Sequence, residues 1–353
     1  MRPTPRTPLV GKDGRDCRLD LMLNLILNSL VPVFFGIGLG LVGGWTRDVD
    51  NHHVGELNAL VMDFAVPASI FAAVVSTSRG TLNDQLGRAG VLTVTMLLVY
   101  AGVFVMARKA YGSTPGEAAI QAITTGLPNY ASAGLPLIAA LLGKEHTVSV
   151  AVAIACGSIV MSPVTLTILS LQAKPASFGG IVSAFLGACK KPIVLAPIIA
   201  VIFVFTGIHM PESLEHSFLL AGEVSGGAGL FLTGLILSGQ KLRFDTNVAI
   251  QVALANIVQP LLAAAMAWAV GLGQELTREA ILLAALPSGF FGILFGLRAN
   301  VTHSAVGASM VVSTALSAAT LPCRHLSHCG NERGMTGLAA AKRLHPNERK
   351  SHA

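Results

Sequence analysis

Five long stretches of the chain contain no charged residue. They cover residues 21–46, 118–143, 147–173, 246–273 and 280–297. The hydrocarbon core of a bilayer is about 30 Å thick, and roughly 20 residues of helix cross it. Only 12% of the residues are Asp, Glu, Lys or Arg, against about 25% in an ordinary soluble domain. The sequence therefore predicts an all-α membrane protein that crosses the lipid bilayer several times.

Ten transmembrane helices account for the distribution of charge along the chain. We expect them at residues 23–45, 55–77, 88–109, 117–143, 147–171, 190–208, 215–239, 246–271, 279–298 and 303–322. Asp63 and Glu223 interrupt the second and seventh of these segments, so a count that omits one of the two is the alternative. Both segments continue as apolar stretches bounded by charge, which favours ten.

The two halves of the chain resemble each other. Five hydroxyl residues and one arginine, Arg88, Thr147, Ser149, Ser158, Ser162 and Thr165, recur 155 residues later as Arg243, Thr302, Ser304, Ser313, Ser317 and Thr320. Five helices per half would invert the second half relative to the first, a 5+5 arrangement that recurs in secondary transporters. We therefore predict a first repeat at residues 22–171, a cytoplasmic connector at 172–189 and a second repeat at 190–322.

The basic residues predict the orientation in the membrane. The loops after the odd-numbered helices carry nine Lys and Arg residues, against four on the other side. Because positively charged loops stay in the cytoplasm, both termini are predicted to be non-cytoplasmic. We expect residues 1–21 to form a disordered N-terminal extension and residues 323–353 to form an atypical C-terminal tail.

Several other classes of function are disfavoured. The net charge is +6, but the basic residues form no stripe interleaved with aromatic ones, so no nucleic-acid partner is expected. The chain contains no His-Glu-x-x-His motif, and Asp63 is the only aspartate inside a predicted helix, which argues against an intramembrane enzyme. The Cys and His spacing between Cys323 and Cys329 fits no standard zinc site, so neither a metal nor a cofactor is expected.

Two of the predicted helices contain a proline followed by polar residues or glycine. Pro128 precedes Asn129 in the fourth helix, and Pro287 precedes Ser288 and Gly289 in the ninth. Proline lacks the backbone donor and clashes with the preceding turn, so each helix is expected either to kink or to break. Two breaks that face each other would bring two helix N-termini to one point, where their partial positive charge attracts an anion.

Two acidic residues, Asp63 and Glu223, lie well inside predicted helices at matching positions in the two halves. An ionisable group in a membrane costs about 3 kcal/mol or more, so both are candidates to carry a coupling proton. The alternative is that they face water or pair with a Lys or Arg at a helix end.

Gly36, Gly40 and Gly44 repeat every four residues in the first helix. Small residues on one face allow two helices to approach closely. The stripe is either a homodimer contact or a packing contact within one subunit.

Around Asp63 and around the two prolines, the chain resembles the auxin efflux carrier family, whose bacterial members include malonate and malate carriers. The similar segments are Phe-Ala-Val-Pro at 64–67, Leu-Pro-Asn at 127–129, Gly-Leu-Pro at 134–136 and Leu-Pro-Ser-Gly-Phe-Phe-Gly at 286–292. The similarity extends from about residue 22 to about residue 322, and residues 289–296 look most like the malonate-type bacterial branch.

The resemblance implies a ten-helix inverted-repeat fold similar to sodium/proton antiporters and bile-acid symporters, in which the broken fourth and ninth helices cross. Helices one, two, six and seven would form a scaffold, and the other six would move. The crossing point would hold the substrate carboxylate, with the family's asparagine falling on Asn129. The candidate substrate-binding residues are Pro128, Asn129, Tyr130, Gly134, Pro287, Ser288 and Gly289.

The expected function is secondary transport of small organic carboxylate anions, malonate-type dicarboxylates above all, by elevator-like alternating access in the inner membrane of a bacterium. The coupling ion would be H+ or Na+. Two alternatives stay open at this point: efflux of an auxin-like aromatic carboxylate, and an anion channel.

Overall fold

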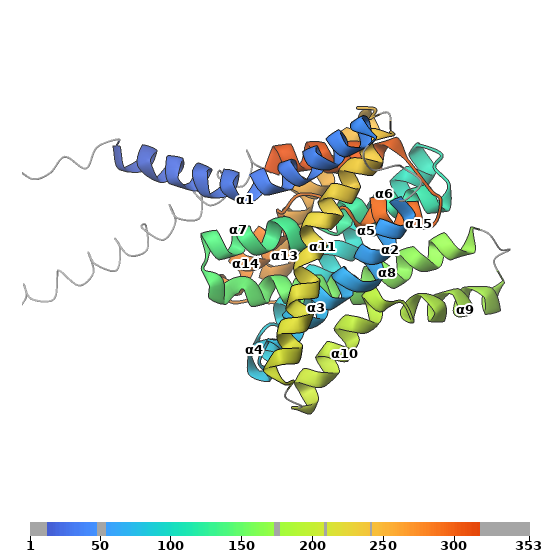
Figure 1. Ribbon diagram of the computed structural model, residues 1–353. Helices are drawn as coiled ribbons and strands as arrows, with labels where there is room; N and C mark the ends of the chain where they lie inside the picture. The colour runs from blue at the N-terminus through green and yellow to red at the C-terminus, as the bar shows by residue number, and fades with distance from the viewer. Residues whose placement is uncertain (1–12, 48–53, 173–176, 208–209, 241, 318–353) are drawn as a thin grey trace, which may run out of the picture.

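The computed structural model describes residues 13–47, 54–172, 177–207, 210–240 and 242–317, without the side chains of residues 13–27 and 144. These residues form helices joined by short loops (Figure 1). Within them the only β-type pairing is one isolated bridge, and no strand is formed. The expected tail at 323–353 and the first twelve residues lie outside the described residues.

The first half of the chain ends with the helix that was expected as the fifth span. Its elements are α1 (Asp13–Thr46), α2 (Val54–Ala59), η2 (Leu60–Ala65), α3 (Val66–Val75), α4 (Arg79–Asp84), α5 (Leu86–Ala110), α6 (Pro115–Gly126), η3 (Tyr130–Gly134), α7 (Leu135–Leu141), η4 (Lys144–His146) and α8 (Thr147–Leu171). The start of α6 is fixed by a capping box, in which Thr114 and Glu117 each bond the backbone N–H of the other.

The second half begins with two helices joined at a sharp bend. Its elements are α9 (Phe178–Cys189), α10 (Pro192–Thr206), α11 (Glu212–Ser238), α12 (Thr246–Ala253), η5 (Leu254–Val258), α13 (Gln259–Ala269), α14 (Gln274–Ala284), α15 (Phe291–Arg298) and a last helix, Ser304–Ser317. In Figure 1, α11 runs across the front of the molecule and meets α1 near the top.

Six of the described helices are long and apolar enough to cross a membrane: Asn28–Thr46, Val54–Val75, Leu86–Ala110, Thr147–Leu171, Glu212–Ser238 and Thr246–Ala269. The pair α9 and α10, bent by 63°, would count as a seventh if both helices belong to one span. Two shorter apolar helices, Tyr130–Leu141 and Ser304–Ser317, complete the apolar set. The predicted class, an all-α protein with several membrane spans, is therefore confirmed.

Two helices differ from the expected boundaries. Helix α1 begins at Asp13, so residues 13–21 are helical and not a disordered extension. Helix α9 occupies most of the segment predicted as a connector, because the Ser177 hydroxyl caps it by accepting from the Gly180 N–H at 3.0 Å and an apolar run follows. The twelve residues of α9 are about 18 Å long, too short to cross a bilayer alone.

Large apolar side chains cover the outside of the molecule. Phe35, Phe64, Phe178, Leu220 and Trp268 are between 64% and 85% exposed. Contiguous apolar surface of this kind marks contact with a membrane or a partner, since water would penalise it. Polar side chains on α6 and α12 are conversely buried, although the core as a whole is mainly apolar.

Three wide π-helical turns each end two residues before a proline. They are η2 before Pro67, η3 before Pro136 and η5 before Pro260. The proline ring clashes with the carbonyl four residues earlier and leaves it without a donor. A π turn widens the backbone there. The N–H just after each turn accordingly bonds the carbonyl five residues back, for example Leu135 to Tyr130.

The glycine stripe of α1 packs against α11 of the same chain. A Cβ at Gly40 would overlap the Phe231 carbonyl, and one at Gly44 would overlap the Ser238 side chain. Gly234 of α11 makes the reciprocal approach to the backbone of α1 at Ile37. Of the two interpretations of this stripe, packing within one subunit is therefore confirmed, and the stripe is not available as a homodimer contact.

Gly40→Leu should lower the melting temperature of the purified protein in detergent, because the added side chain must push α1 and α11 apart. Overpacking of this kind costs about 1–3 kcal/mol. Gly38→Leu is the matched control, since a Cβ at Gly38 meets nothing within 4 Å. Equal melting temperatures for the two variants would contradict this packing.

Candidate functional site

The two proline-containing helices are both interrupted, and the interruptions meet. Helix α6 ends at Gly126 and α14 ends at Ala284, before their prolines. Pro128 and Ser288 then pair as an antiparallel β-bridge. We call residues 127–129 together with residues 287–289 the crossing.

Backbone hydrogen bonds hold the crossing together. The Asn129 N–H donates to the Pro287 carbonyl at 2.8 Å, and the Gly289 N–H donates to the Leu127 carbonyl at 3.0 Å. An alanine at Gly289 would press its Cβ onto the Leu127 carbonyl, so only glycine allows this approach. Each interrupted helix thus satisfies part of the other's broken backbone, as a membrane interior requires.

Three side chains at or beside the crossing are buried, and each has one polar atom without a hydrogen-bond partner. Asn129 is 2% exposed; its Oδ1 accepts from the Ser132 N–H at 3.2 Å, while its Nδ2 has no partner. The Ser288 and Thr124 hydroxyl oxygens also lack partners. Buried polar groups are normally paired, so three together indicate a place where a ligand or water completes the bonding.

Backbone donors add to this set. Among the described residues, the N–H groups of Phe290, Phe291 and Gly292, at the start of α15, make no hydrogen bond. The first N–H groups of a helix carry a partial positive charge. The crossing therefore combines unpaired side-chain donors with an electropositive helix end.

A second layer of polar side chains supports the crossing from α13, η5 and the last helix. The Ser288 N–H donates to Ser313 Oγ at 2.9 Å, and Ser313 Oγ donates in turn to Asn256 Oδ1 at 2.6 Å. Gln259 Nε2 donates to the Gly126 carbonyl at 3.1 Å. These contacts hold both sides of the break in place.

Two residues of the expected binding set lie behind the crossing. Tyr130 is 3% exposed, and its hydroxyl contacts Met96 Sδ at 3.6 Å. Gly134 lies against Leu286, where a Cβ would come within 2.9 Å of the leucine side chain. Tyr130 and Gly134 thus pack η3 against its neighbours. The crossing itself contains Pro128, Asn129, Pro287, Ser288 and Gly289.

Comparison of the sequence with known proteins identifies its family. The sequence pattern of the family described as "Membrane transport protein" matches residues 25–179 and 180–323. The chain belongs to this family. It is therefore a multi-pass membrane transport protein and not an enzyme, and its expected likeness to auxin efflux carriers is confirmed.

The aligned region covers nearly the whole length of each of the relatives of this membrane transport protein named here. It is 28% identical over 310 residues to the "Uncharacterized transporter YfdV" of Escherichia coli K12, covering 85% of this chain and 97% of that one. It is 25% identical to the "Putative malonate transporter" of Rhizobium meliloti, covering 84% and 93%. It is 22% identical to the "Probable auxin efflux carrier component 5a" of rice (Oryza sativa subsp. japonica), covering 82% and 94%.

The two acidic residues singled out in the sequence have different surroundings in this transport protein. Both carboxylate oxygens of Asp63, in η2, accept from Arg298 at the far end of α15, at 2.6 and 2.8 Å. Glu223 is exposed on α11 and forms no ion pair with a described residue. Of the two alternatives for Asp63, the structure therefore agrees with a carboxylate that pairs with an arginine at a helix end. Whether either residue carries a proton stays a prediction.

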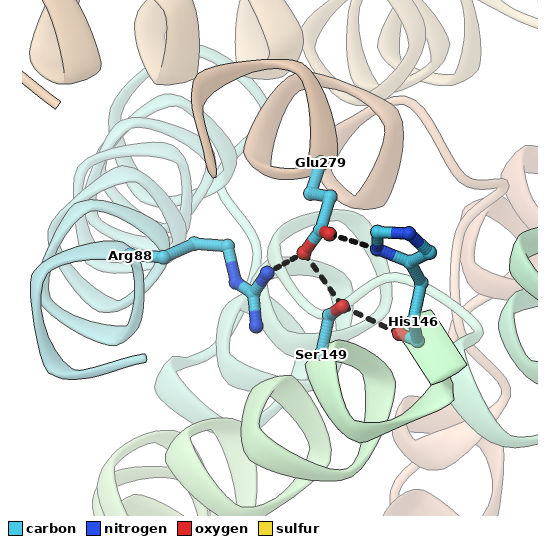
Figure 2. Close-up of polar contacts among 4 residues, drawn as sticks. All are labelled: Arg88, His146, Ser149 and Glu279. Atoms are coloured by element: carbon cyan, nitrogen blue, oxygen red, sulfur yellow. Dashed lines mark hydrogen bonds and ion pairs between the residues drawn. The ribbon is translucent and has the colours of Figure 1, made fainter. Parts of the chain in front are cut away.

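A buried ionic cluster, not predicted from the sequence, lies around Glu279. Glu279 of α14 contacts Arg88 of α5, His146 of η4 and Ser149 of α8, and Figure 2 shows all four side chains converging. We call these four residues the Glu279 cluster. Arg88 and Glu279 lie near the first turn of predicted helices, where charge ordinarily faces water, so the sequence carries no signal that both point inward. The Arg243 that recurs at the position of Arg88 is exposed.

Asp63→Asn should lower the melting temperature, because it leaves Arg298 without its carboxylate partner. Glu223→Gln should leave the melting temperature unchanged. In a double-mutant cycle with Arg298→Gln, the paired change should cost less than the sum of the single changes, with a coupling of up to about 1 kcal/mol for this partly exposed pair. Strict additivity would show that the ion pair contributes nothing to stability.

Proposed function

We propose that this membrane transport protein carries small organic carboxylate anions and binds them at the crossing. The observation that carries the proposal is the group of unpaired donors there: Asn129 Nδ2, the Ser288 and Thr124 hydroxyls and the N–H groups that begin α15. Donors at a helix N-terminus suit an anion and need no lysine or arginine. A carboxylate, with two oxygens that accept several hydrogen bonds, matches such a set.

The proposed architecture is a 5+5 inverted repeat of ten spans. Six or seven of the described helices are long and apolar enough to count as spans. The remaining spans would be the interrupted helices α6–α7 and α14–α15 and the short last helix. On this proposal residues 22–171 and 190–322 are the two repeats, the termini lie outside the cytoplasm, and the protein resides in a bacterial inner membrane.

The burial of the crossing supports a moving carrier over an open channel. Asn129 and Ser288 are 2% and 1% exposed, so a substrate reaches them only after a rearrangement. Residues next to the crossing contact α11: Phe290 lies against Gly229, and the Ser132 hydroxyl donates to the Gly226 carbonyl at 3.4 Å. Helix α11 belongs to the proposed static scaffold together with α1, α2–α3 and α10, past which the crossing and its helices would slide.

The substrate we favour is a malonate-type dicarboxylate. One relative carries the name of a malonate transporter at 25% identity, and the relative named for auxin efflux is 22% identical. The small side chains around the crossing, Ser288, Gly289 and Gly292, also suit a short substrate better than an aromatic one. H+ or Na+ remains the proposed coupling ion, and no cofactor is proposed.

The test is uptake of radiolabelled malonate, malate and an aromatic carboxylate into proteoliposomes with an imposed H+ or Na+ gradient. Asn129→Ala should weaken malonate binding about tenfold or more, because a hydrogen bond to a charged group contributes about 1.5–3 kcal/mol. Pro287→Ala should also weaken it by allowing α14 to continue as helix. Asn83→Ala is the control, since Asn83 is exposed on α4.

Normal malonate binding by both site variants would refute the crossing as the binding site. Preference for the aromatic carboxylate would favour the efflux alternative. Uptake that neither saturates nor is stimulated by substrate on the opposite side would indicate a channel.

A further inference from the structure

The Glu279 cluster links the outer ends of the two half-helices that meet at the crossing. One half-helix, η3–α7, begins at the crossing and leads to His146 in η4. The other, α14, carries Glu279 and leads to the crossing. The contact between His146 and Glu279, drawn in Figure 2, therefore joins these two elements a second time.

The carboxylate of Glu279 is shared among three partners. Its Oε1 contacts His146 Nδ1, and its Oε2 contacts both Arg88 Nη1 and the Ser149 hydroxyl, the latter at 2.7 Å. The Ser149 hydroxyl also lies 2.5 Å from the His146 carbonyl. Helices α5, α8 and α14 are thus held together by one carboxylate.

Burial distinguishes the members of the cluster. The Arg88 and Glu279 side chains are 0% and 5% exposed, whereas the His146 side chain is 24% exposed. Arg88 and Glu279 together are neutral, and a buried pair of opposite charge stays ionised because separating either charge from its partner is costly. His146 is the one member of the cluster that water reaches.

The contact with Glu279 also fixes which histidine nitrogen is free. A carboxylate only accepts, so His146 Nδ1 must carry hydrogen to bond it. Nε2 is then the atom that takes up a further proton from water, and the cluster changes from neutral to a charge of +1. Imidazole changes charge between about pH 5 and 8, the range in which a transporter meets physiological proton gradients.

The other ionisable groups near His146 are few. Lys144 and Glu145 precede it in η4, and Glu145 is exposed. Helix α7 contributes none, and α14 contributes Glu275 and Arg278 besides Glu279. On α8, Cys156 is the ionisable residue close to Arg88. Within the described part of the chain, Glu279 is the only carboxylate that contacts the His146 ring.

We propose that His146, positioned by Glu279, is a proton-binding site that controls how the two half-helices are held relative to each other at the crossing. This inference rests on the carboxylate-carrier function proposed above. Proton uptake at Nε2 strengthens the attraction between His146 and Glu279 and holds α14 to η4. Proton release weakens that attraction and frees the two half-helices to shift relative to each other. Asp63 and Glu223 have no comparable link to both half-helices.

The experiment compares His146→Gln, Glu279→Gln and the matched control Glu275→Gln, which removes an exposed carboxylate one turn earlier on α14. Radiolabelled malonate uptake into proteoliposomes is measured from about pH 5 to 8. Wild type and Glu275→Gln should share one pH profile, and His146→Gln should be flat. Glu279→Gln should change the profile, because His146 loses the carboxylate that positions it.

A second readout separates this proposal from the proposed function. The melting temperature in detergent should rise for wild type relative to His146→Gln as the pH falls from about 8 to 5.5, since the imidazolium gains the Glu279 carboxylate only in the folded state. If wild type takes up no malonate at any pH, the proposed carrier function is refuted. The pH dependence of the melting temperature then decides whether His146 is the proton-binding site.

Unchanged pH dependence of both uptake and melting in His146→Gln would overturn the proposal. So would a pH profile that is lost in Asp63→Asn and kept in His146→Gln. Glu279→Gln removes the partner of a fully buried arginine and can prevent folding. His146→Gln keeps a donor for Glu279, and its outcome decides the question in that case.

Discussion

The structure depends on the backbone pairing of two interrupted helices. A broken helix in a membrane leaves N–H and C=O groups without partners, and lipid offers none. Here residues 127–129 and 287–289 pair with each other, so each interruption repairs part of the other. The donors that remain unpaired afterwards are the ones that the proposed substrate would satisfy.

Sequence reasoning was most successful where one residue type has one strong local effect. Charge-free stretches predicted apolar helices, and Pro128 and Pro287 predicted interruptions, because lipid and the proline ring act on the chain whatever its neighbours are. The same reasoning gave the crossing residues Asn129 and Ser288, although not the end of α6 at Gly126. The sequence did not distinguish Asn129 and Ser288 from Tyr130 and Gly134, which pack behind the crossing. The direction of each side chain depends on the backbone geometry of the break, which the sequence pattern does not define.

Features that depend on tertiary contacts could not be predicted in this way. Glu279 and Glu275 stand one turn apart on α14, yet only Glu279 is buried, because α5 and α8 cover that face. The glycines of α1 indicated a close approach but not the partner, which is α11. The segment of α9 was expected to be a connector because twelve residues are too few for a span. Its apolar side chains, which are unusual in a loop, were the signal that it forms a helix.

The π turns before Pro67, Pro136 and Pro260 carry a consequence for the phase of each helix. A widened turn holds one residue more than an α-helical turn, and each residue advances an α-helix by about 100°. Everything beyond the turn is therefore rotated by about that angle relative to an uninterrupted helix. Lipid-facing and inward-facing stripes do not align across the turn, and deletion of one residue there would turn the inner face of α3, α7 or α13 outward. Related chains should consequently gain or lose the proline and the extra residue together.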